Sequence, residues 1–182
     1  MAEELEEGKK LAIYRLIVTR YKNLINEKES QSVSEIRQKV SPYNPVIKKL
    51  ASKLSGGDGE KIIDSLDFFT YLQRTLLLVK KIKTCEFAFS FWLSYEEMLD
   101  LQVATKMDKA ILLCSLLRAF GQESTVVVSK KGNNYVRFKM NEVVYLASSE
   151  SGSLFSGEDV AKMLADDLLI YSFSDLIYEN YE

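Results

Sequence analysis

The feature that most constrains the fold is an apolar helix near the middle of the chain, predicted to begin at Asp108 and to end at Gly121. Its apolar residues run almost all the way round the helix and continue as far as Phe120. A helix that is apolar on every side must be buried among other elements. Glycine is a natural helix C-cap because it adopts the left-handed conformation without a steric penalty. We therefore expect this helix to form the buried centre of the domain.

After Gly121 the hydrophobic period changes from helical to strand-like. The β-prone runs are Thr125–Ser129, Tyr135–Met140 and Glu142–Ala147. Polar turn residues separate these runs, a pattern typical of an antiparallel meander. A short helix is predicted to start at Ser156–Asp159, and Leu168–Phe173 is predicted as the final strand. Helices followed by strands indicate an α+β fold with the sheet packed against the central helix.

The first half of the chain is predicted to be mainly helical, because its apolar residues recur at helical spacing. The expected helices are Leu5–Glu27, a short helix opened by Ser32–Glu35 and ended before Pro42, Val46–Leu54, a helix of about 20 residues through Ile62–Val79, and Ser94–Leu101. Ser32–Glu35 and Ser94–Glu97 both have the Ser-x-x-Glu form of a capping box. Alternating Phe87, Phe89 and Phe91 indicate an extended segment with one buried face.

The glycine cluster Gly56–Gly59 is the clearest boundary in the sequence. Its spacing does not fit a phosphate-binding loop, so we interpret it as an interhelical loop in which Asp58 caps the next helix. This boundary predicts a helical extension at residues 1–55 that packs on an α+β core at residues 58–182.

Composition excludes several kinds of chemistry. The 182 residues contain no histidine, which removes the commonest general base and the commonest metal ligand. Two cysteines, Cys85 and Cys114, cannot form a zinc site alone, so we expect no metal and no cofactor. The net charge of −2 gives no global attraction to nucleic acid or anionic membrane. We find no secretory signal and no membrane-spanning run, and the expected location is the cytoplasm.

The run from Trp92 to Gly121 resembles the transglutaminase-like superfamily, and most closely its predicted cysteine proteases from archaea. Members of this superfamily show an aromatic residue, a Glu-x-Leu helix, Gly-Asp-Cys-x-Asp-Lys/Ser and an apolar Leu-Leu-x-x-Leu-Leu-Arg helix that ends in glycine. The residues that fall into this register without a gap are Trp92, Glu97, Leu99, Asp108, Leu112, Leu113, Leu116, Leu117, Arg118 and Gly121. The resemblance covers about the last two-thirds of the chain. It implies a transglutaminase-like, papain-like core.

The same register implies that all three catalytic positions are vacant. The family uses a cysteine at a helix N-terminus, a histidine base and an aspartate that orients the histidine. Lys106 occupies the nucleophile position, Asn133 or Asn134 the histidine position, and Ala147 or Ser148 the aspartate position. Asparagine cannot shuttle a proton, and alanine cannot orient an imidazole. We expect no catalytic residue among them, and we expect Trp92 to line the remnant of the substrate groove.

Other candidates do not replace the missing triad. Cys114 lies two turns into the apolar helix, where burial would raise its pKa and block access. Cys85 has more cationic neighbours but no base. Lys106 could act as a Schiff-base lysine only if its pKa were lowered, and Asp108 opposes the effect of nearby Lys109.

The sequence therefore predicts a catalytically inactive transglutaminase-like protein that acts as a binding or scaffolding module. Trp92, Lys106, Asn133 and Ala147 are the expected lining of its degenerate cleft. The expected partner is another protein or a second copy of the chain, with no nucleic acid and no membrane. The alternative is a hydrolase or acyltransferase with repurposed residues in the same cleft.

Overall fold

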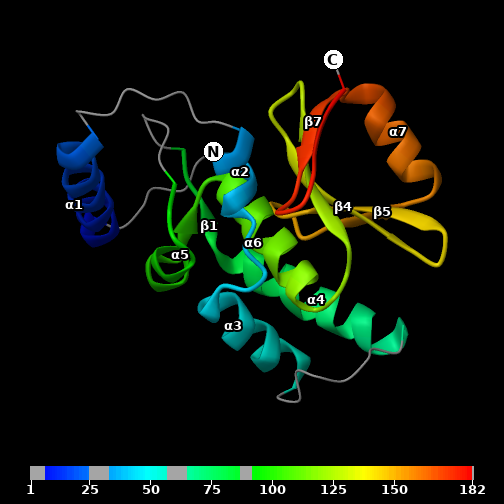
Figure 1. Cartoon of the computed structure of the whole chain (residues 1–182), viewed down its shortest axis with the longest axis horizontal. Coiled ribbons are helices and arrows are strands. Elements are labelled where there is room, and N and C mark those ends of the chain that lie inside the picture. The colour runs from blue at the N-terminus through cyan, green and yellow to red at the C-terminus, as the bar shows by residue number, and fades with distance from the viewer. Residues whose placement is uncertain (1–6, 25–32, 57–64, 87–91, 182) are drawn as a thin grey trace.

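The computed structural model describes residues 7–24, 33–56, 65–86 and 92–181. These residues form a mixed helix and sheet structure, which confirms the predicted α+β class (Figure 1). The helices are α1 (Glu7–Leu24), α2 (Val33–Lys39), α3 (Pro45–Ser55), α4 (Ser65–Lys81), α5 (Tyr95–Leu101), α6 (Lys106–Ala119) and α7 (Glu158–Asp166). The strands are β1 (Lys83–Thr84), β2 (Val103–Ala104), β3 (Ser124–Ser129), β4 (Asn134–Met140), β5 (Val143–Ser148), β6 (Leu154–Ser156), β7 (Leu169–Phe173) and β8 (Tyr178–Asn180).

The predicted central helix is α6, and it is buried along almost its whole length. It begins at Lys106, two residues before the predicted start at Asp108. The prediction was wrong at this end because Thr105 is the N-cap residue, and Asp108 closes a capping box with it from the third helical position. At the other end Gly121 has a φ of 92° and follows the C-cap residue Phe120. The amide groups of Gly121 and Gln122 donate to the carbonyls of Arg118 and Leu117, as in a Schellman motif.

The predicted meander is confirmed in β3, β4 and β5, which pair antiparallel in chain order. The strand order of the sheet is β6-β5-β4-β3-β7-β8, so β7 returns to lie beside β3. The prediction that Leu168–Phe173 is the final strand was wrong, because Tyr178–Asn180 forms a further hairpin with β7. Strands as short as β6 and β8 carry too few residues to show a period of two.

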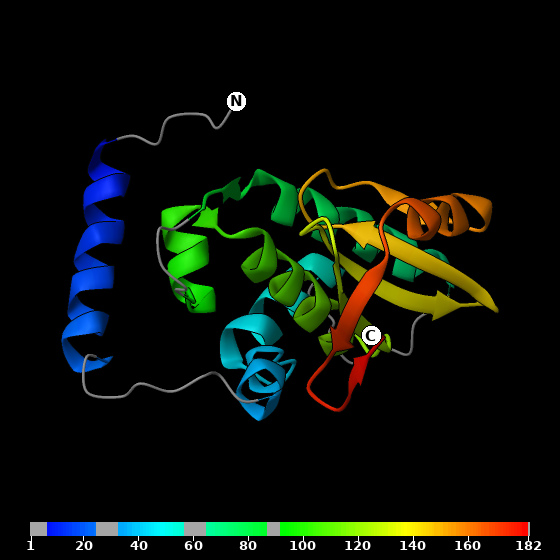
Figure 2. The same ribbon diagram turned by 90° about the horizontal axis from the view of Figure 1, so that it is seen from above.

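The core lies between α6 and one face of this sheet, and α3 and α4 pack on the other side of α6. Val126, Val136, Phe138 and Phe173 supply the sheet's side of this core. Figure 2 shows the sheet with α7 at one end of the molecule and α1 at the other, beyond α5. Helices α1 and α7 are therefore far apart, and α6 lies between them.

The helices of residues 33–55 belong to the same core as α6. Val40, Ile47 and Ala51 are buried in a single hydrophobic cluster with its leucines. Asn44 caps α3 by accepting a hydrogen bond from the amide of Val46. The division into residues 1–55 and 58–182 remains a prediction. The capping box at Ser32, the cap at Asp58 and the extended segment of Phe87, Phe89 and Phe91 lie outside the described residues.

Candidate functional site

The N-terminus of α6 lies at the end of the sheet where β4 begins and β5 ends. Lys106, the first residue of α6, places its Nζ 3.3 Å from a carboxylate oxygen of Glu150, which follows β5 by two residues. At the same end of the sheet, Tyr135 of β4 is paired with Ser148 of β5. The structure therefore brings the helix start to the strand ends on which the family resemblance places the base and its orienting residue.

Lys106 is held by a partly exposed ion pair. About a third of its side chain and half of that of Glu150 are accessible to solvent. An ammonium at a helix N-terminus is disfavoured by the helix dipole, and the carboxylate of Glu150 offsets this repulsion. A pair exposed to this extent contributes between zero and about 1 kcal/mol to stability, so it leaves Lys106 accessible at little cost.

Of the two asparagines, Asn134 lies on the α6 side of the sheet. Side chains alternate along a strand, so Asn134 shares its face with Val136 and Phe138, which pack in the core. Its Oδ1 is buried and has no hydrogen-bond partner among the described residues. Asn133 precedes the strand, and its side-chain amide donates to Asp167 at 2.8 Å. Of the two candidates for the histidine position, Asn134 is therefore the one that faces α6.

Ala147 is fully buried in β5, opposite Val136 of β4. It also belongs to the core cluster and so faces α6. The hydroxyl of its neighbour Ser148 accepts a hydrogen bond from the amide of Ser151, inside the turn after β5. The orienting position is thus occupied by a methyl group on the core side and by a turn-forming serine beside it.

Trp92 lies between the first turn of α6 and the N-terminal helices. Its carbonyl accepts a hydrogen bond from Arg20 of α1, and its ring lies 5.6 Å from the Nζ of Lys39. A backbone hydrogen bond from the next residue, Leu93, reaches the carboxylate of Asp108. The indole Nε1 is buried without a partner among the described residues. Trp92 therefore lies beside the helix start, and its role in lining a groove stays a prediction.

Two charged residues that were not predicted as site residues are buried beside Lys106. Asp108 is 2% exposed and accepts hydrogen bonds from the hydroxyl and the amide of Thr105. Burial raises its pKa to about 6, although the hydrogen bonds from Thr105 oppose the rise. The Thr-x-x-Asp spacing of Thr105 and Asp108 is a sequence signal that could have revealed this capping box.

Lys109 is 1% exposed, which is unusual for a lysine. Its Nζ donates to the carbonyl of Ile82 at 2.9 Å and lies 3.2 Å from the hydroxyl of Thr84. Burial lowers its pKa, and the nearby carboxylate of Glu150 opposes this change. The local sequence carries no signal for this arrangement, because the two acceptors lie on a segment about 25 residues earlier.

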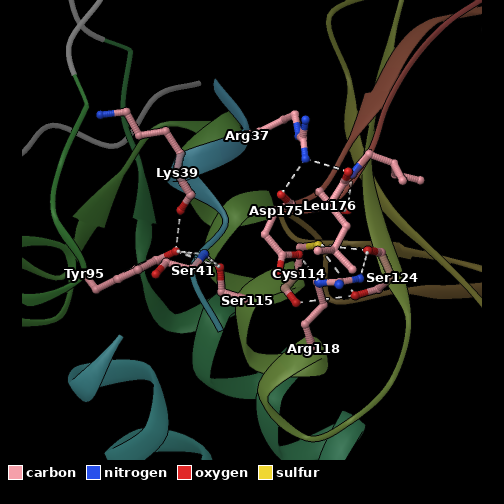
Figure 3. A network of polar contacts seen from close by, with 12 residues as sticks. Arg37, Lys39, Ser41, Tyr95, Cys114, Ser115, Arg118, Ser124, Asp175 and Leu176 are labelled. Carbon is pink, nitrogen blue, oxygen red and sulfur yellow. Dashed lines mark hydrogen bonds and ion pairs between the residues drawn. The ribbon is translucent and has the colours of Figure 1, made fainter. Parts of the chain in front are cut away.

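The two cysteines are not placed as nucleophiles. Cys114 is fully buried, and burial raises the pKa of its thiol to about 12. Its Sγ lies 3.5 Å from both the carbonyl and the hydroxyl of Ser124 (Figure 3). This confirms the prediction of a core cysteine. Cys85 is partly exposed, and burial together with the charge of Glu86 raises the pKa of its thiol.

The predicted site residues therefore gather only in part. Lys106, Asn134 and Ala147 lie at one end of the sheet, and Trp92 lies beside the start of α6. Asn133 instead points toward Asp167. In the described part of the chain no hydrogen bond or ion pair joins Lys106 to Asn134, and no three His, Cys, Asp or Glu side chains are placed to share a metal ion. Lys106 and Asn134 offer hydrogen bonds and a positive charge to a bound group.

Comparison with known families gives a match over part of the chain. The family described as the CEP76 peptidase-like domain matches residues 90–164, which run from just before Trp92 through α6, the meander and most of α7. The matched segment is less than half of the chain. The matched segment is thus similar to a transglutaminase-like or peptidase-like domain. This is consistent with the superfamily that the run from Trp92 to Gly121 resembles. Neither the curated proteins nor the solved structures contain a match to this chain.

Proposed function

We propose that this chain is a catalytically inactive transglutaminase-like protein that acts as a binding or scaffolding module. We place it with the archaeal predicted cysteine proteases of that superfamily, as a member that has lost the cysteine, histidine and aspartate. The residues around the start of α6, namely Trp92, Lys106, Asn133 or Asn134 and Ala147, are its proposed degenerate site.

The observation that carries the proposal is the ion pair between Lys106 and Glu150 at the first residue of α6. A transglutaminase-like mechanism needs a thiolate at this point, because the helix dipole stabilises a negative charge there. The ammonium of Lys106 has the opposite charge and engages a carboxylate. The contact supports the inactive protein, because the family's nucleophile position here forms an ion pair instead of carrying a thiolate.

The two other vacated positions give independent support. Asn134 has no titratable group, and the chain contains no histidine that could move into its place. Ala147 presents only a methyl group toward α6. Asp108 and Asp167 are buried carboxylates of this region: Asp108 is committed to the cap of its own helix, and Asp167 accepts hydrogen bonds from Asn133 and from the amide of Lys131. Among the described residues, neither carboxylate has a hydrogen bond to Lys106 or Asn134.

The alternative is a hydrolase or acyltransferase that uses Lys106 as its nucleophile. This requires a free amine as the nucleophile, whereas the Nζ of Lys106 is paired with the carboxylate of Glu150. The contact therefore supports the inactive protein over the repurposed enzyme.

An assay of the purified full chain separates the two. We expect no turnover of peptide, amide or activated ester substrates above the buffer rate, for the wild type and for Lys106→Ala alike. Lys139→Ala is the control, because Lys139 also forms an ion pair with a glutamate, Glu142, at the opposite end of β4 from Asn134. Turnover that is lost in Lys106→Ala but kept in Lys139→Ala would establish the enzyme instead.

The same preparation tests a nucleic-acid role. We expect no retardation of DNA or RNA at low salt, since the net charge is −2. A salt-dependent retardation of DNA or RNA would contradict the protein-binding proposal and indicate nucleic-acid binding instead.

A further inference from the structure

α1 presents two apolar faces, and within the described part of the chain only one of them packs against other elements. Ile13 is 5% exposed, and Leu16 and Ile17 pack against the core. Arg20 anchors the same face through Glu97 and the carbonyl of Trp92. This side of α1 is therefore fixed to the body of the protein next to α5 (Figure 2).

Leu11, Tyr14 and Val18 point the other way, with exposed fractions of 52%, 63% and 66%. Their spacing of three and then four residues is that of positions a, d and a in a coiled-coil heptad. We call these three residues the outer seam of α1. In the sequence Tyr21 continues the same spacing. Apolar residues confined to positions a and d form a narrower stripe than the one by which a helix packs on a sheet or lies in a membrane surface. The outer seam therefore fits a single partner helix.

Cations flank the seam on both sides. With Leu11 at position a, Lys10 occupies position g and Arg15 occupies position e. Both side chains are exposed, and neither forms an ion pair within the described structure. Residues at e and g select the partner of a coiled coil through interhelical ion pairs. The seam is therefore complementary to a helix that carries Asp or Glu at those positions.

The same charges disfavour a second copy of α1. In a parallel pair of identical helices, Lys10 at g of one helix meets Arg15 at the following e of the other. In an antiparallel pair e meets e and g meets g, so cations again meet cations. Like charges at these positions are a device against self-pairing.

We propose that the outer seam of α1 docks an amphipathic helix of another protein, with apolar residues at a and d and acidic residues at e and g. The inference rests on the proposed function, because it names a partner class for a binding module. Arg20 then has the role of holding α1 so that this face stays turned outward.

The test uses the full chain and two synthetic four-heptad peptides. Both carry Ile at a and Leu at d; one carries Glu at every e and g, and the other carries Lys. We expect the Glu peptide to bind about tenfold more tightly than the Lys peptide at low salt, and the difference to shrink as salt screens the charges. Titration calorimetry measures both affinities.

A charge reversal makes the test specific. The double variant Lys10→Glu, Arg15→Glu should reverse the order of the two peptides, and Leu11→Glu with Val18→Glu should abolish binding of both. Lys53→Glu with Lys130→Glu is the matched control, since both lysines are exposed and lie on other elements. This control should leave the affinities unchanged. All four replaced side chains on α1 are exposed, so folding is expected to be preserved.

Several results would overturn the proposal. The first is equal affinity for the two peptides. The second is a dimer of the wild type in sedimentation that the outer-seam variants no longer form. The third is binding to anionic lipid vesicles that the outer-seam variants lose. The proposed function fails separately, through Lys106-dependent turnover, which does not involve the peptides.

Discussion

Asp108 and Lys109 are adjacent charged residues that the fold buries for different purposes. Asp108 turns back to the N-cap of its own helix, whereas Lys109 reaches away to the carbonyl of Ile82. Burial pushes each group toward its neutral form, so the pKa of the acid rises to about 6 and that of the amine falls. Both residues stabilise the position of α6 through hydrogen bonds at an electrostatic cost.

Asp108→Asn is predicted to change how stability depends on pH. The pKa of Asp108 is raised from 3.8 to about 6 on folding, so the folded state binds its proton more tightly than the unfolded chain does. The stability that protonated Asp108 contributes is fully present below the pKa of the unfolded chain. It is lost as pH rises through the pKa of the folded protein. Relative to the variant, the wild type should lose about 3 kcal/mol between pH 4 and pH 7. Urea unfolding at several pH values measures the difference.

Asp100→Asn is the control for this experiment, because Asp100 is exposed on α5. Its stability should run parallel to that of the wild type through the same pH range. If the stability of Asp108→Asn also ran parallel to that of the wild type across this pH range, the carboxylate of Asp108 would be solvated in the folded protein.

At the scale of elements, α6 is defined by its two ends. The capping box of Thr105 and Asp108 satisfies amide groups at the start, and the Schellman motif at Gly121 satisfies carbonyls at the end. The residues between these ends are buried on nearly all sides, so no polar face of the helix marks its extent. The caps therefore decide where a helix with no clear polar face begins and ends.

Thr105→Ala is predicted to destabilise the protein by about 1 kcal/mol, while Thr105→Ser retains most of the stability. Alanine leaves the amide of Asp108 without its acceptor and removes a hydroxyl donor from the carboxylate. Serine keeps both hydrogen bonds. Thermal and urea unfolding at neutral pH compare the three proteins, and an equal loss in both variants would mean that the methyl group of Thr105, not its hydroxyl, matters.

At the scale of the whole molecule, polar contacts tie the N-terminal helices and the last hairpin to α6 (Figure 3). Arg37 of α2 donates to the carbonyls of Asp175 and Leu176, and Arg118 of α6 pairs with the carboxylate of Asp175. Tyr95 of α5 joins α6 to the segment before α3. Segments far apart in the sequence are thus fastened at one helix.

Tyr95→Phe is predicted to lower the free energy of unfolding by about 1–2 kcal/mol. Its hydroxyl donates to the carbonyl of Lys39 at 2.6 Å and lies 2.7 Å from the hydroxyl of Ser115. Phenylalanine removes both contacts and leaves the carbonyl without this donor. Urea unfolding measures the loss.

Tyr43→Phe is the matched control, because Tyr43 is 77% exposed. It should change stability by less than about 0.5 kcal/mol. If Tyr95→Phe were equally silent, the contacts to Lys39 and Ser115 would not hold the N-terminal segment in place.

The α+β class, the buried central helix and the antiparallel meander were all predictable from the sequence. Each follows from a local pattern, since the period of the apolar residues changes at Gly121 from helical to alternating. Boundaries were predictable where a cap residue is visible, as at Ser94. The start of α6 was misplaced because the Asp108 side chain caps the helix from within it.

The candidate site depended more on the tertiary structure. The sequence register named Lys106 and Ala147 but left Asn133 and Asn134 as alternatives, and the strand alternation put Asn134 on the α6 side. The burial of Lys109 and the ion pair of Lys106 with Glu150 join positions far apart in the chain. No local pattern encodes such contacts.

The sequence by itself determined the main helices, the antiparallel meander and the absence of histidine, because these follow from the order of the residues. Only the tertiary structure decided which face of each amphipathic element is covered. On α1 it covered Ile13 and left Leu11, Tyr14 and Val18 exposed, although both sets recur at helical spacing. The physical reason is that periodicity measures how apolar a face is, whereas burial depends on which partner the folded chain brings against it.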